Sequence, residues 1–177
     1  MHGFGSNQRI EPKGRCHLRK HKGFSLIELL IVVAIILIIA AIAIPNLLRA
    51  RIAANESSAV QSVRTVNTAQ VAYNSAYSTV GFSSDLNSLG GTSCTPPSSS
   101  GACLIDTQLQ SGSKSGYSFG MQGVTGTPAS TYQIIAAPIT PNQTGVRYFC
   151  SFADAVVRVN PTGAISTCDY TQSPLNQ

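Results

Sequence analysis

The chain has 177 residues, a formal net charge of +5 and hydrophobic residues at 43% of its positions. This length gives one modest globular domain with extensions and excludes two full-sized cores. The three histidines, His2, His17 and His21, all precede residue 24, so the remainder has no imidazole for metal ligation or proton transfer, which excludes most common hydrolytic designs.

The positive charge is concentrated at the start of the chain. Residues 1–23 hold six basic residues and one acidic residue, which accounts for the whole net charge, and the rest is neutral. A DNA-binding surface needs clustered Lys and Arg, and beyond residue 23 only Arg49 and Arg51 lie close together. We therefore predict no specific nucleic-acid partner.

Residues 24–44, FSLIELLIVVAIILIIAAIAI, are apolar apart from Ser25 and Glu28. At 1.5 Å per residue they span about 31 Å, which matches the hydrocarbon core of a bilayer. The basic residues before this run orient the N-terminus toward the cytoplasm. The alternative is a secretory signal peptide cut near Ala43, but the run is too long for an h-region and a carboxylate interrupts it.

The stretch KGFSLIELL, residues 22–30, resembles the type IV prepilin signal, with a basic leader, a Gly, an aromatic residue and a Glu four positions later. The resemblance continues through Ala34 and Pro45 to residue 49. It implies that an aspartyl prepilin peptidase cuts after Gly23 and methylates the new amine of Phe24. The leader is longer than many in the family and contains Cys16.

Glu28 needs a reason to lie in a membrane helix, because a carboxylate costs about 2.5 to 3.5 kcal/mol at the centre of the bilayer and less near an end. The resemblance implies that Glu28 neutralises the Phe24 amine of a neighbouring subunit and so sets the register of assembly. The simpler alternative is that Glu28 lies close enough to the interface to snorkel or to become protonated.

Pro45 removes a backbone donor and clashes with the preceding turn, which predicts a kink or local melting near Ile44. It also fits the outer end of the membrane span. After Pro45, apolar and weakly polar residues recur at helical spacing, which predicts an amphipathic helix. This half continues the membrane segment, so we predict a single helix over residues 24–77, roughly 80 Å long. The recurring residues are Ile52, Ala59, Val63, Val66, Ala69, Tyr73 and Tyr77.

From residue 81 the composition changes to that of a small head. Residues 88–101 are rich in Ser, Gly, Thr and Pro and predict an irregular surface loop. Short β-type runs follow at 117–121, 131–137, 147–152 and 155–159, with a further short run at 164–167. They predict an antiparallel sheet of about four strands packed on the apolar stripe of the helix, which makes the fold class α+β.

Four cysteines, Cys94, Cys103, Cys150 and Cys168, follow the leader. An even number in an exported head predicts two disulfides with three conceivable connectivities. We favour the pairs Cys94–Cys103 and Cys150–Cys168, because each closes a local loop. Zinc is the alternative, but the head has no histidine and no CxxC pair.

No motif predicts an enzyme, a cofactor site or a metal site. Ser111 to Lys114 matches the S-x-x-K pattern of acyl enzymes, but it lies in a serine-rich loop without a K-T-G partner. No phosphate-binding loop or G-x-S-x-G elbow is present. Asn55 and Asn142 match the N-glycosylation pattern, a signal of little weight in a bacterial protein.

The resemblance implies a structural subunit of a type IV pilus, held in the bacterial inner membrane before assembly and in an extracellular filament afterwards. The layout is a leader (1–23), a transmembrane and polymerisation helix (24–44), an amphipathic half (45–80) and a head (81–177). The implied partners are other copies of the subunit, the prepilin peptidase and N-methyltransferase, the inner-membrane assembly platform with its separate ATPase, and the bilayer.

Two alternatives stay open. One is a type II secretion pseudopilin, whose filament is short and periplasmic. The other is a membrane-anchored or secreted binding module, which forms no polymer. The sequence leaves open whether the subunit is major or minor, and whether a filament serves twitching motility, adhesion, DNA uptake or electron transfer.

Overall fold

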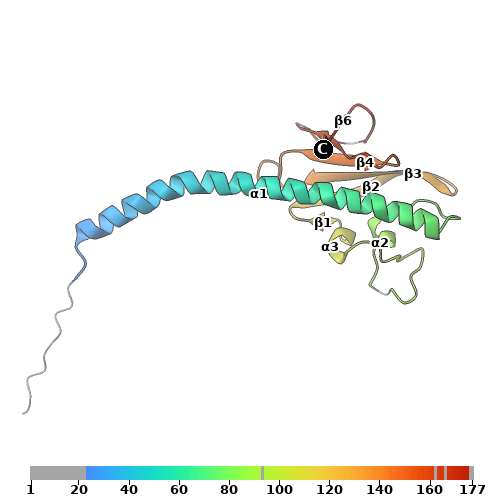
Figure 1. Cartoon of the computed structure of the whole chain (residues 1–177), viewed down its shortest axis with the longest axis horizontal. Helices are drawn as coiled ribbons and strands as arrows, with labels where there is room; N and C mark the ends of the chain where they lie inside the picture. Colours follow the sequence, from blue (N-terminus) through green and yellow to red (C-terminus); the bar gives the residue numbers. More distant parts are fainter. Residues whose placement is uncertain (1–22, 93, 162, 166, 176–177) are drawn as a thin grey trace, which may run out of the picture. The chain divides into compact units, whose positions relative to one another are not determined.

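The structure is a computed structural model that describes residues 23–92, 94–161, 163–165 and 167–175 (Figure 1). The predictions for the leader before Gly23 lie outside these residues. The chain divides into two compact units, Met1–Ala41 and Ile42–Gln177. A long helix and an antiparallel sheet make up most of the described residues, so the α+β class is confirmed.

The long helix α1 runs from Leu26 to Ala76, two residues inside the predicted start and one inside the predicted end. Pro45 lies within α1, and the helix continues without a break on both sides. Of the kink or local melting predicted near Ile44, the local melting is therefore wrong for this structure. A proline removes one i to i−4 hydrogen bond, while the turns before and after it keep theirs.

The second half of α1 lies along one face of the sheet (Figure 1). Its apolar stripe packs with strand residues in one core, which includes Tyr117, Tyr132, Ile134 and Phe149. The predicted stripe is confirmed at five positions that are at most 5% exposed, and its end members Ile52 and Tyr77 are half-buried. The five buried members are Ala59, Val63, Val66, Ala69 and Tyr73.

The sheet has six antiparallel strands in sequential order, so each strand pairs with the one before it. The β2–β3 hairpin is its longest part, and Ala129 at its tip hydrogen bonds to the chain leaving α1 at Val80 and Phe82. The strands are β1 (Ser113–Lys114), β2 (Tyr117–Gly126), β3 (Ala129–Pro138), β4 (Tyr148–Phe152), β5 (Arg158–Asn160) and β6 (Ser173–Pro174).

Three of the predicted strands correspond to β2, β3 and β4, and the fourth needs correction. The strand predicted at 155–159 begins only at Arg158, because Ala155 has a φ of 58° and its N–H donates to the Phe152 carbonyl in a turn. Ala164 and Ile165, in the run predicted at 164–167, are not in a strand. The pattern missed β1 and β6, which are two residues long and show no alternation.

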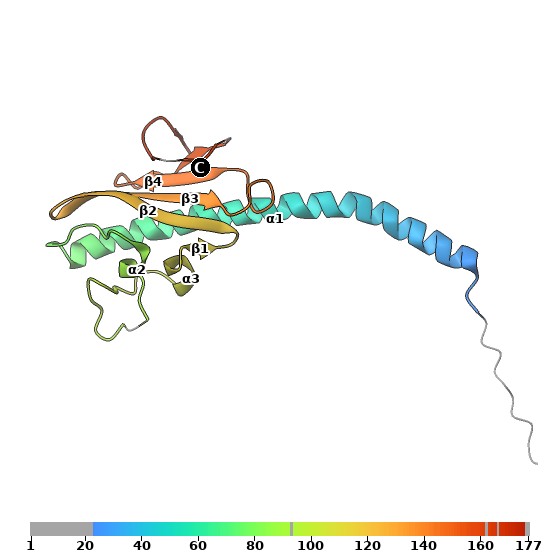
Figure 2. The ribbon, with the colours of Figure 1, turned by 180° about the vertical axis from the view of Figure 1, so that it is seen from behind.

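Two short helices, α2 (Leu86–Leu89) and α3 (Thr107–Gln110), flank the Cys94–Cys103 loop. Asp85 caps α2 by accepting the Ser88 N–H, and Asp106 caps α3 by accepting the Leu109 N–H. Both helices lie on the opposite side of α1 from β4 and β6 (Figures 1 and 2). The irregular loop predicted at residues 88–101 contains little regular structure apart from the end of α2.

Candidate assembly site

The first half of α1 presents a continuous apolar surface. Each large hydrophobic side chain between Leu26 and Ile44 is exposed, from 47% at Val33 to 80% at Leu26. The helix contains an 18-residue window with a mean hydropathy of 3.3 and no buried residue, which gives it the length and composition of a membrane span. An apolar surface of this extent requires lipid or protein to cover it.

Glu28 caps the start of α1. Its Oε2 accepts the backbone N–H of Ser25 at 2.9 Å, and the Ser25 carbonyl accepts the Leu29 N–H at 3.2 Å. Ser25 and Glu28 have the S-x-x-E spacing of a capping box, in which the N3 carboxylate satisfies the N-cap donor. The other oxygen of Glu28, Oε1, accepts no hydrogen bond from the described part of the chain.

The Gly23–Phe24 bond lies just before the helix, in a stretch without regular structure. The Phe24 side chain is 84% exposed. A Cβ built on Gly23 would meet no atom within 4 Å. Within the described residues, nothing in the chain shields this bond from a peptidase.

Glu56 fastens the second half of α1 to the chain that leads into β4. One of its carboxylate oxygens accepts the backbone N–H groups of Val146 and Arg147, both at 3.0 Å, and the other accepts Arg147 Nε at 2.7 Å. Burial would raise the pKa of Glu56, but these donors outweigh burial and hold its pKa below the ordinary value. The carboxylate therefore stays ionised while only 6% of the residue is exposed.

Two buried amides fix α1 against the head. Asn67 donates to Ser151 Oγ at 2.9 Å and to the Ala155 carbonyl at 3.2 Å, and it accepts the Tyr132 hydroxyl at 3.1 Å. Gln70 makes a reciprocal pair with the backbone of Ser83, at 2.8 and 3.0 Å. Directional bonds of this kind allow one axial position of the helix on the sheet.

Glu56, Asn67 and Gln70 are polar residues that lie between the apolar positions of the stripe in the sequence, and the structure buries all three. The spacing of these residues from the apolar stripe predicts their burial. Glu56 precedes Ala59 by three residues, Asn67 follows Val63 by four and Gln70 follows Val66 by four, so each lies on the buried face of the helix. Their polarity alone would place them on the solvent side of the helix.

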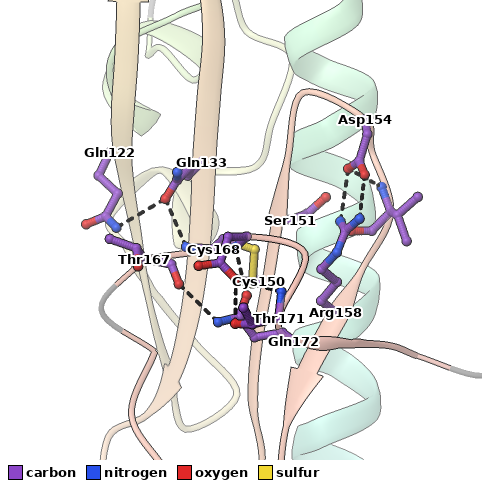
Figure 3. Close-up of a disulfide and its surroundings, with 12 residues drawn as sticks. Gln122, Gln133, Cys150, Ser151, Asp154, Arg158, Thr167, Cys168, Thr171 and Gln172 are labelled. Atoms are coloured by element: carbon purple, nitrogen blue, oxygen red, sulfur yellow. Dashed lines mark hydrogen bonds and ion pairs between the residues drawn. A yellow bond between two sulfur atoms is a disulfide. The ribbon is translucent and has the colours of Figure 1, made fainter.

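The disulfides join Cys94 with Cys103 and Cys150 with Cys168, the two local pairs favoured from the sequence. Figure 3 shows the second bridge on the sheet, where Gln133 Oε1 accepts the Cys168 N–H at 3.0 Å. Cys150 and Cys168 are buried. This bridge therefore attaches the segment that leads to β6 to the central strands of the sheet.

The described residues do not assemble the S-x-x-K pair into a site. The Ser111 hydroxyl donates to the Gln108 carbonyl, and Lys114 pairs with Asp106 at 2.8 Å. The described residues also contain no group of three or more His, Cys, Asp or Glu side chains arranged for a metal ion. Asn55, of the first glycosylation pattern, uses its amide to donate to the Thr144 carbonyl at 2.8 Å.

Comparison with known proteins finds relatives at the N-terminal end. Residues 18–44 match the family model described as the prokaryotic N-terminal methylation motif. The chain is 65% identical over 40 residues to the type IV wide pilus major component PilA4 of Thermus thermophilus, and 46% identical over 54 residues to the type IV major pilin protein PilA of Myxococcus xanthus.

These matches cover 23% and 30% of this chain, and only 30% and 24% of the two relatives. No solved structure matches the chain. The family-model match includes the Gly23–Phe24 bond, Glu28 and the apolar run up to Ile44, and the chain is similar to the two pilus proteins over a short segment only.

Proposed function

We propose that the chain is the structural subunit of a type IV pilus. The observation that carries this proposal is the fully exposed apolar first half of α1, preceded by a methylation motif and continued by a helix that is fastened to a disulfide-containing head. The lipid bilayer covers the apolar surface before assembly, and the helices of other copies cover it in the filament. The two relatives are pilus components by name.

In this proposal residues 1–23 form a cytoplasmic leader, and a prepilin peptidase cuts the Gly23–Phe24 bond and methylates the Phe24 amine. The exposure of that bond supports the assignment. Cleavage removes six basic residues and one acidic residue, which leaves a chain with equal numbers of basic and acidic side chains. An inner-membrane platform and a separate ATPase then move the subunit into the extracellular filament.

Glu28 has two roles in this proposal. Its Oε2 holds the first turn of its own helix through the Ser25 N–H, and Oε1 accepts the Phe24 amine of an adjacent copy. A pair of desolvated opposite charges fixes the register between stacked helices. Pro45 lies at the outer end of the membrane span, where the exposed apolar run gives way to the part of the helix that packs on the head.

The proposed role is structural rather than catalytic. Ser111 and Lys114 bind other partners and form no nucleophile–base pair, and the relatives named above are a pilus component and a pilin by name.

Mass spectrometry of material sheared from the cell surface tests the proposal. We expect an intact subunit that begins at Phe24, carries one added methyl group and contains two disulfides. Electron microscopy of the same material should show filaments made of this subunit. A processed subunit found only in short periplasmic assemblies indicates a pseudopilin instead. A chain that begins near Ile44, or an uncut chain held in the membrane, contradicts processing as a pilin.

A further inference from the structure

Some charged side chains of the Ile42–Gln177 unit form ion pairs and others do not. Three ion pairs form within it, Lys114 with Asp106, Arg147 with Glu56 and Arg158 with Asp154, at 2.6 to 2.8 Å. Among the described residues of this unit, the cations left without an ion pair are Arg49, Arg51 and Arg64, all on α1. The carboxylates left without one are Asp85 and Asp169. The unit therefore carries charges of both signs that form no ion pair within its described residues.

Arg64 is the one of these arginines that lies within the stretch of α1 from Glu56 to Tyr73 that contributes buried residues, and Arg64 itself is half-buried. It lines a groove of about 410 Å³ between the outward face of α1 and Leu104. Ala69 and Ala72 give the groove short side chains, and Thr65 and Thr68 supply hydroxyls. A half-buried guanidinium without a counter-ion favours a carboxylate, and the short side chains leave room beside it for a ring.

Asp169 and Tyr170 have the complementary chemistry. The Tyr170 side chain is 80% exposed, and one edge of its ring rests on Phe152 at a centroid distance of 5.1 Å. The carboxylate of Asp169 accepts the Thr171 N–H and hydroxyl through Oδ1, and Oδ2 accepts no hydrogen bond from the described residues. Asp85 is less available, because Ser84 and Ser88 donate to its two oxygens.

The base under Asp169 and Tyr170 is rigid. The Cys150–Cys168 bridge lies two residues before both Phe152 and Tyr170, and the Arg158 guanidinium lies 4.2 Å from the Phe152 ring and 5.1 Å from the Tyr170 ring. Arg158 also attracts Asp169, but both of its terminal nitrogens already bind Asp154. A pre-ordered aromatic residue beside a carboxylate loses little conformational entropy on binding.

We propose that Asp169 and Tyr170 of one copy dock into the α1 groove of a second copy, where Asp169 pairs with Arg64. This proposal rests on the proposed function, because it describes a contact between subunits of the filament. In the filament of the proposed function the contact is heterologous, so each copy keeps a free groove or a free Asp169–Tyr170 pair for the next copy. Such a contact repeats along an open filament rather than closing into a dimer.

Photo-crosslinking in assembled filaments tests the contact directly. The full chain carries p-benzoylphenylalanine at position 170, is expressed in the producing bacterium, and is irradiated as sheared filaments. We expect crosslinked dimers in which peptide mass spectrometry places the second attachment within residues 61–72 or at Leu104. Attachment only elsewhere on the subunit, or only to cell-surface glycans, overturns the proposal.

Charge variants test the pairing. Arg64→Gln removes one positive charge from the groove, and the control Ser75→Glu makes the same change in net charge on the exposed side of α1 outside it. We expect Arg64→Gln to lower the yield of sheared filaments by about tenfold, as loss of one partner of an interface charge pair does. Ser75→Glu should assemble normally, and the swap Arg64→Asp with Asp169→Arg should recover most of the yield lost by either change alone.

The outcomes separate the two proposals. Equal amounts of processed, disulfide-bonded subunit in the membrane show that the variants fold, so a lower filament yield reports assembly. If the wild type forms filaments and Arg64→Gln assembles normally, the contact is overturned and the pilus function stands. The same conclusion follows if the swap assembles no better than its single variants. A wild-type subunit that is processed but forms no filament contradicts the pilus function itself.

Discussion

Glu56 on α1 binds Arg147, the residue just before β4, with 2.7 Å between Oε2 and Nε, and the same carboxylate accepts the backbone N–H groups of Val146 and Arg147. The two residues are 91 positions apart. One side chain of the helix thereby holds the loop between β3 and β4, and the stability of the head depends on its charge.

We expect Glu56→Gln to destabilise the head by about 2 kcal/mol, because charge-assisted hydrogen bonds are lost and a buried amide NH₂ is placed against N–H donors. Thermal unfolding of the detergent-solubilised mature chain at neutral pH measures the effect. The control Ser75→Glu adds a carboxylate on the exposed face of the same helix, 19 residues from Glu56, and should leave the unfolding temperature nearly unchanged. Equal stability of Glu56→Gln and wild type would show that the carboxylate does not hold this loop.

The same carboxylate predicts a pH dependence. The pKa of Glu56 is lower in the folded state than its ordinary value of 4.5, so its contribution is fully present above that value and is lost as the pH falls through the folded-state pKa. The difference in unfolding temperature between wild type and Glu56→Gln should be largest at neutral pH and should shrink as the pH falls below about 4.5. A difference that stays constant down to strong acid contradicts the prediction.

Asn67→Leu should cost about 2 to 3 kcal/mol, because it leaves the buried Tyr132 and Ser151 hydroxyls without their partner. Burial already raises the pKa of Tyr132 to about 12, so its hydroxyl stays protonated and needs an acceptor. Denaturant unfolding measures the loss. The triple variant Asn67→Leu, Tyr132→Phe, Ser151→Ala removes all three side-chain polar groups and should recover part of it. No recovery would show that packing, not hydrogen bonding, sets the cost.

Removing the Cys150–Cys168 bridge should destabilise the head more than removing Cys94–Cys103. The bridges span 18 and 9 residues, for which loop entropy alone gives about 3.2 and about 2.6 kcal/mol. The Cys150–Cys168 bridge is also buried in a cluster with Ile165, whereas Cys94 is exposed. Paired Cys→Ser variants, compared by chemical denaturation, test the order. A larger loss from the exposed bridge contradicts it.

For Glu28, an alanine and a glutamine variant separate capping from charge pairing. Glu28→Ala should insert normally and assemble poorly. Glu28→Gln retains an oxygen that can accept the Ser25 N–H but loses the negative charge, so we expect it to be processed and also to assemble poorly. Membrane fractions and sheared filaments, quantified beside the control Leu30→Ile, measure both steps. Abundant normal filaments from Glu28→Gln would show that capping, not charge, is what assembly requires.

Sequence patterns predicted the parts of this molecule that depend on local chemistry. Helical spacing from Ala59 to Tyr73 placed the buried stripe of α1, and the local spacing of the cysteines indicated both bridges. The patterns did not predict features that depend on distant partners. The buried Glu56 is stabilised by donors at Val146 and Arg147, and no property of the helix segment alone reveals them.

The predicted strand boundaries were wrong for a related reason. The run from Ala155 has the composition of a strand, but Ala155 adopts a φ of 58° because the chain turns there to bring Asp154 to Arg158. The positions of β1 and β6 depend on their neighbours in the sheet, since two residues carry no periodic signal. The continuity of α1 through Pro45 likewise reflects the helical turns on both sides rather than the proline itself.

The sequential order of the six strands has a kinetic consequence for the folding of the head. Every strand pairs with the one before it, so the sheet closes only short loops as it forms, and short loops cost little chain entropy. Low contact order of this kind favours rapid folding. The hairpins therefore need no distant segment of the chain to begin pairing. If the head is exported, as in the proposed function, the sheet begins to form as soon as successive strands have crossed the bilayer.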